Sequence, residues 1–391
     1  MSQRLSIGLL LPTLPGYSET FIYSKINGLL ESGYIVSLFI NHYNKYDVFD
    51  IDIPVYSQAN VSKKYLFPII LFVLIIMHPI IVFNFVRQER ISNKSWSTIL
   101  KHIIINSHIL NKKLDWIHFE FATMGIDREN VAKAMGIKST VSFRGFDIGL
   151  YPHQHQGCYN LLWKTIVKVH TISDALYQQA IDLGLNPIIP VKKITPAIDT
   201  NFFLSKKISE LHNPIRILSV GRLTWIKGFE YALKALNLLQ YKNIDFVYSI
   251  VGEGDYREAI TYAIHQHGLS DKVKLKGKLS HKEVKEEMEW ADIYIQPSIQ
   301  EGFCNAVLEA QAMGLPCIVS NAEGLPENVI NNKSGWVVNK RSSQQIADKI
   351  NEVLSMNKKE LNQIRKYARR RVIQHYSIEH QKDSFNWFYK L

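Results

Sequence analysis

Short apolar runs alternate with helical patterns through the second half of the chain. The runs have strand length, are rich in β-branched residues, and cover 215–221, 246–252, 272–277, 293–298, 316–320 and 335–338. Between most of them, segments such as 229–240 and 281–291 place apolar residues at helical spacing. Strands that are apolar throughout and separated by helices are typical of a parallel sheet buried on both faces. The pattern therefore predicts a Rossmann-like domain.

The first half shows the same alternation less regularly. Its strand candidates are 6–13, 35–41, 116–122, 140–145, 168–173 and 192–198. Residues 199–214 carry turn residues and break the pattern, so we expect the linker there. The chain then has two doubly wound α/β domains. In open sheets of this kind, ligands bind at the carboxyl ends of the strands.

One stretch of the first half, residues 65–86, is apolar almost throughout. It is long enough to span a bilayer, but two prolines, a histidine and an asparagine interrupt it. It is read in three ways: an interfacial hairpin or helix pair, a buried pair of core helices, or a transmembrane span. Basic residues on both flanks favour a segment lying on one anionic leaflet, namely Lys63, Lys64, Arg87 and Arg90.

Composition and charge narrow the function classes only slightly. Hydrophobic residues make up 46% and charged residues 21%, which excludes a disordered chain. The net charge of +11 fits nucleic acid, an anionic membrane or a phosphorylated ligand. The three cysteines include no C-x-x-C pair, which disfavours a disulfide framework or a cysteine metal site and fits a reducing cytosol. The "DID" at 50–52 stands alone between polar turns, so no metal site is predicted.

The stretch "EGFCNAVLEA" at 301–310 follows a predicted strand and opens a short helix that Asn305 can cap. Glu301 then lies on the loop at the carboxyl edge, and Glu309 lies about one turn inside the helix. The amides of 302–305 point outward at the helix start and attract anions. Carboxylates accept hydrogen bonds from sugar hydroxyls, so the stretch suits a molecule with both sugar and phosphate. A solvated glutamate and a helix-dipole acid remain the alternative.

A second strand–turn–helix stretch, "SVGRLTWIKGFEYAL" at 219–233, favours the binding site over the alternative. Arg222 and Lys227 lie in its turn, between Gly221 and Gly228. An arginine fork and a lysine point charge at a carboxyl edge suit a diphosphate. Two solvated loop cations are the alternative, which the joint placement with the glutamate loop makes less plausible.

Together, "GRLTWIKG" and "EGFCNAVLE" resemble the two signatures of family-4 retaining glycosyltransferases, including the E-x7-E spacing of Glu301 and Glu309. The segments 195–203, 248–258 and 275–284 resemble the same family in the expected order. The resemblance implies the GT-B fold, two Rossmann-like doubly wound domains facing a cleft. It implies an acceptor-binding domain at 1–205, a nucleotide-sugar domain at 206–375, and a last helix at 376–391 crossing back to the first domain.

The resemblance also implies roles for individual residues. Arg222 and Lys227 would hold the donor diphosphate, Glu301 the transferred sugar near the reacting carbon, and Glu309 the nucleotide ribose. These first three are the predicted catalytic residues. The other predicted donor-binding positions are loop glycines near the base and amides near sugar and phosphate: Gly221, Gly252, Gly277, Gly302, Phe303 and Cys304. The family retains anomeric configuration and needs no metal or other cofactor.

Acceptor-side candidates follow strands of the first domain: Gly16, Ser18, Glu19, His118, Arg144 and Asp147. "PGYSETFI" at 15–22 resembles the opening loop of polysaccharide-building members. Arg144 stands where relatives often have a histidine, and arginine cannot act as a base. We therefore expect Arg144 to bind an acid or phosphate, or to pair with Asp147. Glu120 is a weaker candidate.

The resemblance implies a hexosyltransferase that builds exopolysaccharide, capsule or lipopolysaccharide. Its partners would be a nucleotide sugar, a lipid-linked or oligosaccharide acceptor and an anionic membrane, with no nucleic acid. Its place would be the cytoplasm, peripheral on the inner face of the cell membrane. The alternatives are another GT-B nucleotide-sugar enzyme such as an epimerase, and a non-catalytic basic protein that binds membrane or RNA.

Overall fold

The computed structural model describes residues 4–16, 19–43, 49–59, 64–204 and 210–390, which divide into two units. Unit 1 comprises residues 1–195 and 381–391, and unit 2 comprises 196–380. The division between the units lies after Thr195, whereas the sequence predicted it after residue 205. Backbone bonding explains the difference, because Ile198 pairs with Ser377 and so belongs with unit 2.

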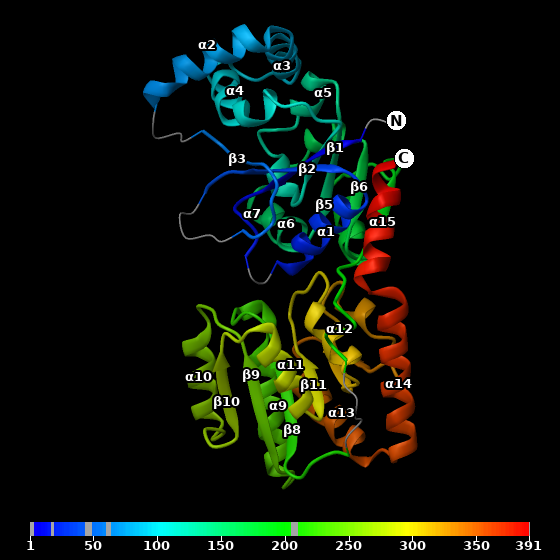
Figure 1. The fold of residues 1–391 in the computed structure, drawn as a ribbon. Coiled ribbons are helices and arrows are strands. Elements are labelled where there is room, and N and C mark those ends of the chain that lie inside the picture. Colours follow the sequence, from blue (N-terminus) through cyan, green and yellow to red (C-terminus); the bar gives the residue numbers. More distant parts are fainter. Residues whose placement is uncertain (1–3, 17–18, 44–48, 60–63, 205–209, 391) are drawn as a thin grey trace. The chain divides into compact units, whose positions relative to one another are not determined.

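Unit 1 is built on a seven-stranded sheet in the order β3-β2-β1-β4-β5-β6-β7, with every neighbouring pair parallel (Figure 1). The strands are β1 (Ser6–Leu11), β2 (Ile35–Ile40), β3 (Val55–Ser57), β4 (Trp116–Phe119), β5 (Lys138–Phe143), β6 (Lys168–Thr171) and β7 (Val191–Lys193). Strand order reverses between β1 and β4, which is the place where ligands typically bind in open α/β sheets. β3 was not predicted, since a three-residue edge strand after Pro54 carries little pattern.

The helices of unit 1 cover the sheet and form one distinct end. They are α1 (Thr20–Glu31), α2 (Phe67–Met77), α3 (Pro79–Ile91), α4 (Trp96–Leu110), α5 (Val131–Met135), α6 (Phe146–Gly149), α7 (Tyr151–Gln154) and α8 (Asp174–Asp182). The predicted apolar segment forms α2 and α3, which bend by 112° and lie with α4 at that end (Figure 1). Most of their large side chains are exposed, so the segment is not a buried core pair.

Unit 2 has a six-stranded parallel sheet in the order β10-β9-β8-β11-β12-β13. Its strands are β8 (Ile215–Val220), β9 (Phe246–Val251), β10 (Val273–Gly277), β11 (Ile293–Gln296), β12 (Cys317–Ser320) and β13 (Trp336–Val338). Its helices are α9 (Phe229–Tyr241), α10 (Arg257–Gln266), α11 (His281–Trp290), α12 (Asn305–Ala312), α13 (Ser343–Ser355) and α14 (Lys358–His375). Here the order reverses between β8 and β11.

The last helix, α15 (Ile378–Lys390), runs from the end of unit 2 into unit 1. There it packs on the sheet: Phe388 O accepts a hydrogen bond from Lys168 Nζ at 2.6 Å, and Tyr389 contacts His118. The aromatic, amphipathic character of residues 384–391 thus has a structural cause in the described part of α15, because Phe385, Phe388 and Tyr389 are buried.

Candidate donor site

The loop after β8 carries the two predicted cations. It turns through the short 3-10 helix Trp225–Lys227 and reaches α9 through Gly228, whose φ is +63°. A Cβ on Gly228 would lie 2.3 Å from Pro297 O, so only glycine fits this close approach. Ile299 N also donates to Ile226 O at 2.7 Å. The loops after β8 and β11 are therefore fastened together at the point where strand order reverses.

Three predicted glycines meet at the neighbouring strand ends. Gly221 N donates to Val251 O at 2.9 Å, and Gly252 N donates to Gly277 O at 2.8 Å. A Cβ on Gly252 would lie 1.9 Å from Gly221 O. The backbones of β8, β9 and β10 thus touch directly at the carboxyl edge, beside the cation loop.

Lys227 and Glu301, predicted from separate stretches, form an ion pair. Lys227 Nζ lies 2.5 Å from Glu301 Oε2, and the two side chains are only 14% and 12% exposed. Burial acts to lower the pKa of Lys227, but the Glu301 carboxylate more than reverses this, so the pKa is raised. The partner of Glu301 comes from 74 positions away, which explains why no neighbouring charge was visible in the sequence.

A chain of hydrogen bonds that begins in β11 orients the Glu301 carboxylate. Tyr294 Oη donates to Gln296 Oε1 at 2.8 Å, and Gln296 Nε2 donates to Ser298 Oγ at 2.9 Å. Ser298 Oγ in turn donates to Glu301 Oε2 at 3.2 Å. The Glu301 backbone is fixed as well, since its N–H donates to Glu323 Oε2 at 2.9 Å. The carboxylate is therefore held in one orientation, facing the lysine.

The start of α12 departs from the predicted amide cradle in two respects. Cys304, not Asn305, occupies the N-cap position. The backbone of Cys304 is bracketed by the buried Asn328 side chain, which accepts from its N–H at 3.1 Å and donates to its carbonyl at 2.9 Å. The Cys304 amide is thus occupied. Within the described residues, the amides of Gly302 and Phe303 have no acceptor, so these two remain able to bind an anion.

Arg222 and Glu309 are the two predicted charges that lack a partner among the described residues. The Arg222 side chain is exposed, and it lies on the same loop after β8 as Lys227. Glu309 is partly buried in the second turn of α12, and burial raises its pKa to about 7. The unpaired guanidinium on the loop after β8, the two free amides on the loop after β11 and the unpaired carboxyl on α12 offer complementary groups for a phosphate and for hydroxyls.

In unit 1, the structure brings His118 and Arg144 close to Glu120, but not in the way predicted. Arg144 Nη2 donates to Glu120 Oε2 at 2.7 Å, while Glu120 also pairs with Lys25. The Asp147 carboxylate instead accepts from the backbone N–H groups of Ala122, Arg144 and Gly145. Of the two partners expected for Arg144, its side chain therefore binds an acid, Glu120, while Asp147 contacts only its backbone N–H.

His118 is fully buried, and burial holds its pKa well below the usual value. Its ring contacts Tyr389 Oη and lies 2.6 Å from Ser142 Oγ. Glu19 closes a local turn by accepting from Gly16 N at 2.9 Å. Ser18 lies outside the described residues.

Lys25 was missed by sequence reasoning. It is 1% exposed and lies on the buried stripe of α1 with Ile22, Ile26 and Leu29. A lysine at a core position of an amphipathic helix was the signal that could have found it. Lys25 and Arg144 both pair with the carboxylate of Glu120.

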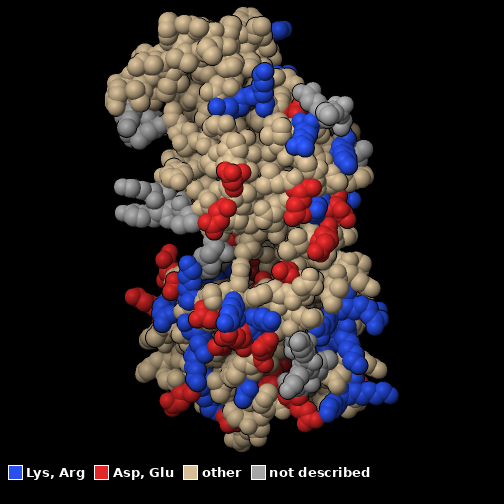
Figure 2. Space-filling model, in the orientation of Figure 1, with Lys and Arg blue, Asp and Glu red and all other residues tan. Residues whose placement is uncertain are grey.

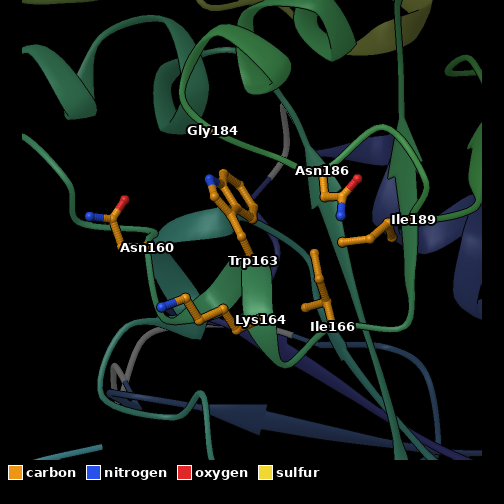
Figure 3. Close-up of a pocket in the computed structure, with 7 residues that line it drawn as sticks. All are labelled: Asn160, Trp163, Lys164, Ile166, Gly184, Asn186 and Ile189. Carbon is orange, nitrogen blue, oxygen red and sulfur yellow. The ribbon is translucent and has the colours of Figure 1, made fainter.

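Two further observations complete the description of possible sites. Among the described residues, no three His, Cys, Asp or Glu side chains gather in a way that could hold a metal ion. A hollow of about 590 Å³ in unit 1 is lined by Asn160, Trp163, Lys164, Ile166, Gly184, Asn186 and Ile189 (Figure 3). Its lining precedes β6 and β7, so it lies at the amino ends of these strands and contains no predicted site residue.

Sequence comparison relates the second unit to a known family. Residues 201–371 match the family model for glycosyl transferases group 1. Over those residues the chain is similar to group 1 glycosyltransferases. The matched residues contain both loops of the candidate donor site.

The relatives match over part of their length. The chain is 32% identical over 239 residues to the amylovoran biosynthesis glycosyltransferase AmsK of Erwinia amylovora, covering 59% of this chain and 58% of AmsK. It is 31% identical over 181 residues to the putative colanic acid biosynthesis glycosyltransferase WcaL of Escherichia coli K12, covering 45% of each. The chain thus spans about half the length of the curated relatives it matches.

Solved structures resemble the whole chain in fold. Anabaena HepE in complex with UDP-glucose has a TM-score of 0.72 at 16% identity, covering 99% of this chain and 100% of HepE. A glycosyltransferase from Rickettsia africae ESF-5 has a TM-score of 0.72 at 18% identity, covering 99% and 98%. With the two parallel sheets, these likenesses confirm the predicted two-domain α/β GT-B fold.

Proposed function

We propose that the protein is a retaining, metal-independent glycosyltransferase of cell-surface polysaccharide synthesis. It moves a sugar from a nucleotide-diphosphate-sugar donor to a lipid-linked glycan acceptor, on the cytoplasmic face of the cell membrane. The observation that carries this proposal is the fastening of Lys227 to Glu301 across the strand-order reversal of unit 2. This is the place in an open α/β sheet where a ligand is expected. The bound UDP and UDP-glucose of HepE support a nucleotide-sugar donor.

In this proposal the negative end of the reaction is stabilised by fixed groups. The bond between sugar C1 and the phosphate oxygen breaks, and the diphosphate gains charge. Arg222, Lys227 and the free amides of Gly302 and Phe303 all present positive charge or N–H donors to it. The Lys227 ammonium has three donors, so it can hold a phosphate oxygen while still pairing with Glu301. These groups supply the charge that a metal ion supplies in other transferases.

In this proposal Glu301 stabilises the positive charge that develops on the sugar. Its carboxylate, held by Ser298 and Lys227, accepts from the sugar hydroxyls and offsets the charge that develops at C1. Front-face attack by the acceptor hydroxyl then gives retention: the new C1–O bond forms as the old one breaks. The hydroxyl proton passes to the leaving diphosphate. Glu309, in its ionised form, accepts from the ribose hydroxyls.

Calorimetric titration with UDP, GDP and their sugar conjugates tests the donor site. We expect one nucleotide sugar to bind the full chain and Lys227→Ala to abolish that binding. Lys234→Ala is the matched control, because Lys234 is an exposed lysine of α9 outside the loop. Unchanged binding by the Lys227 variant would remove the basis of the proposal. Conversion of the donor by the protein alone, with no acceptor added, would favour an epimerase instead.

A non-catalytic basic protein is less well supported. On the face of unit 2 visible in Figure 2, acidic and basic side chains are interspersed rather than gathered in a basic stripe. Nucleic-acid binding typically needs basic residues clustered on one surface. That reading would also leave the paired lysine and glutamate of the donor loops without a purpose.

A further inference from the structure

The end of unit 1 formed by α2 and α3 exposes a large apolar surface. On α2 the side chains of Ile69, Phe72, Val73, Ile75, Ile76 and Met77 are 47–66% exposed, and Leu74 is the one buried residue of this helix. On α3, Ile80 and Phe83 are 74% and 68% exposed. Figure 2 shows this end of the unit as a surface with almost no charge. Contiguous apolar surface of this kind marks an interaction site.

The outer stripe of α3 changes from apolar to basic with distance from the bend. Ile80, Phe83, Arg87 and Arg90 follow one another at positions i, i+3, i+7 and i+10, all exposed. At about 1.5 Å per residue, Arg87 lies roughly 10 Å along the helix from Ile80. Such a distance matches the depth of burial of an interfacial helix, about 5–10 Å into the headgroup–acyl boundary. The apolar end and the basic end thus fit acyl chains and anionic headgroups respectively.

A tryptophan lies at the basic level. Trp96, at the start of α4, is 60% exposed, and the Arg90 guanidinium stands 5.2 Å from its ring centre. Tryptophan side chains concentrate where hydrocarbon meets headgroups. The acidic residue of α3, Glu89, is turned inward, where it contacts His102 Nδ1 at 2.7 Å and Asn130 Nδ2 at 2.8 Å. Neither helix therefore presents a carboxylate outward to repel an anionic surface.

Helix length and anchoring argue for insertion from one side. No single helix of the described residues meets the length and composition of a membrane span, while the bent pair meets it jointly. At 11 and 13 residues, each helix is roughly 16–20 Å long, short of the ~30 Å hydrocarbon core. Both helices contact α4, so the pair leaves and rejoins the same body of unit 1.

We propose that the α2–α3 pair is a wedge that inserts its bend into one leaflet of an anionic membrane, with Arg87, Arg90 and Trp96 at the headgroup level. This inference deepens the proposed function by naming the surface that brings unit 1 to its lipid-linked acceptor. It rests on that function only for the choice of the cytoplasmic leaflet.

Vesicle co-sedimentation of the full chain tests the wedge. We expect binding to phosphatidylcholine vesicles that contain phosphatidylglycerol, and weaker binding to phosphatidylcholine alone. Phe72→Glu/Ile76→Glu should lower the partition coefficient about tenfold or more, since it places charge in the acyl region. Ile188→Glu is the matched control, because Ile188 is 84% exposed in the same unit but distant in sequence from the pair. Equal binding by the Phe72/Ile76 variant and the control would overturn the proposal.

Charge and depth are tested separately. Arg87→Gln should weaken binding to the anionic vesicles but not to phosphatidylcholine vesicles. Lys164 is an exposed lysine elsewhere on unit 1, and Lys164→Gln should leave both unchanged. Brominated lipids should quench the fluorescence of the wild type more than that of Trp96→Phe. Equal quenching of both proteins would contradict the assigned depth.

Two further measurements separate this proposal from its rivals. If the surface is instead an interface between copies of the chain, light scattering will show that the wild type is an oligomer and the Phe72/Ile76 variant a monomer. The wild type will then not bind vesicles. That result would overturn the wedge. Nucleotide-sugar affinity, measured on the same preparations, reports unit 2. Normal affinity without vesicle binding refutes the wedge alone, and vesicle binding without donor affinity refutes the donor site alone.

Discussion

Lys227 and Glu301 form an ion pair between the loop that follows β8 and the loop that follows β11. Each side chain is largely buried, and each is the ion-pair partner of the other at 2.5 Å. Removing one leaves the other as a partly buried charge without compensation, whereas removing both does not. The pair therefore has a structural role in the free protein, in addition to the role proposed for it with donor.

A double-mutant cycle measures this dependence. Lys227→Ala and Glu301→Ala should each destabilise unit 2, and the double variant should be less destabilised than their sum by about 1–3 kcal/mol. Urea unfolding monitored by tryptophan fluorescence gives the values. Additive effects would show that the pair is not formed in solution. In activity assays, Glu301→Gln should lose turnover while retaining more donor affinity than Lys227→Ala.

The raised pKa of Glu309 predicts opposite effects of pH on stability and binding. The pKa is about 7 in the folded protein against a usual 4.5, so the folded state holds the proton more tightly. Stability therefore falls as pH rises through this window, and Glu309→Gln should be more stable than wild type at pH 8 by about 1 kcal/mol. Below pH 4.5 this difference should vanish.

Donor binding should respond to Glu309 in the other direction. In the proposed ribose role only the ionised carboxylate accepts from both hydroxyls, so affinity for the nucleotide should rise between about pH 6 and 8. Glu309→Gln should bind more weakly and lose most of that pH dependence. Calorimetry of both proteins across the range makes the comparison, and parallel pH profiles would contradict the ribose role.

Gly228 should tolerate no side chain, for a reason that a second glycine isolates. Gly268 has the same φ of +63°, but a Cβ there meets nothing within 4 Å. Gly268→Ala should cost about 1–2 kcal/mol for the left-handed backbone alone. Gly228→Ala should cost more, because its Cβ would meet Pro297 O at 2.3 Å, and donor affinity should fall as the two loops separate. Equal costs would refute the close approach.

His102 should stabilise the base of α3 below alkaline pH. Burial acts to lower the pKa of His102, but hydrogen bonds and charge from Asp127 and Glu89 outweigh burial and raise the pKa to about 9, against a usual 6.5. A raised pKa stabilises the fold fully below 6.5, and this stabilisation is lost as pH rises through 9. Hydrogen exchange of α3 and α4 should therefore quicken from pH 7 to 9 beyond its chemical rate. His102→Gln should remove that extra change.

The sequence predicted where the residues of the candidate donor site lie, because these residues occupy short continuous stretches. The strand–turn–helix pattern located Arg222, Lys227, Glu301 and Glu309 at one carboxyl edge, and strand order brings these loops together. What it missed depends on contacts between distant segments. The capture of the Cys304 amide by Asn328 comes from a loop 24 residues away. The buried Lys25–Glu120–Arg144 cluster likewise joins three segments whose pairing no local pattern encodes.

The glycine contacts at the ends of β8, β9 and β10 limit how this protein can be re-engineered. Because the backbone at Gly252 already touches that of Gly221, this part of the proposed donor site has no room for a side chain. A directed-evolution library for a different nucleotide or sugar should hold Gly221, Gly228 and Gly252 constant. Diversity belongs at exposed loop positions that have no proposed part in binding the diphosphate, such as Trp225, where a new side chain alters the ligand's surroundings without moving the scaffold.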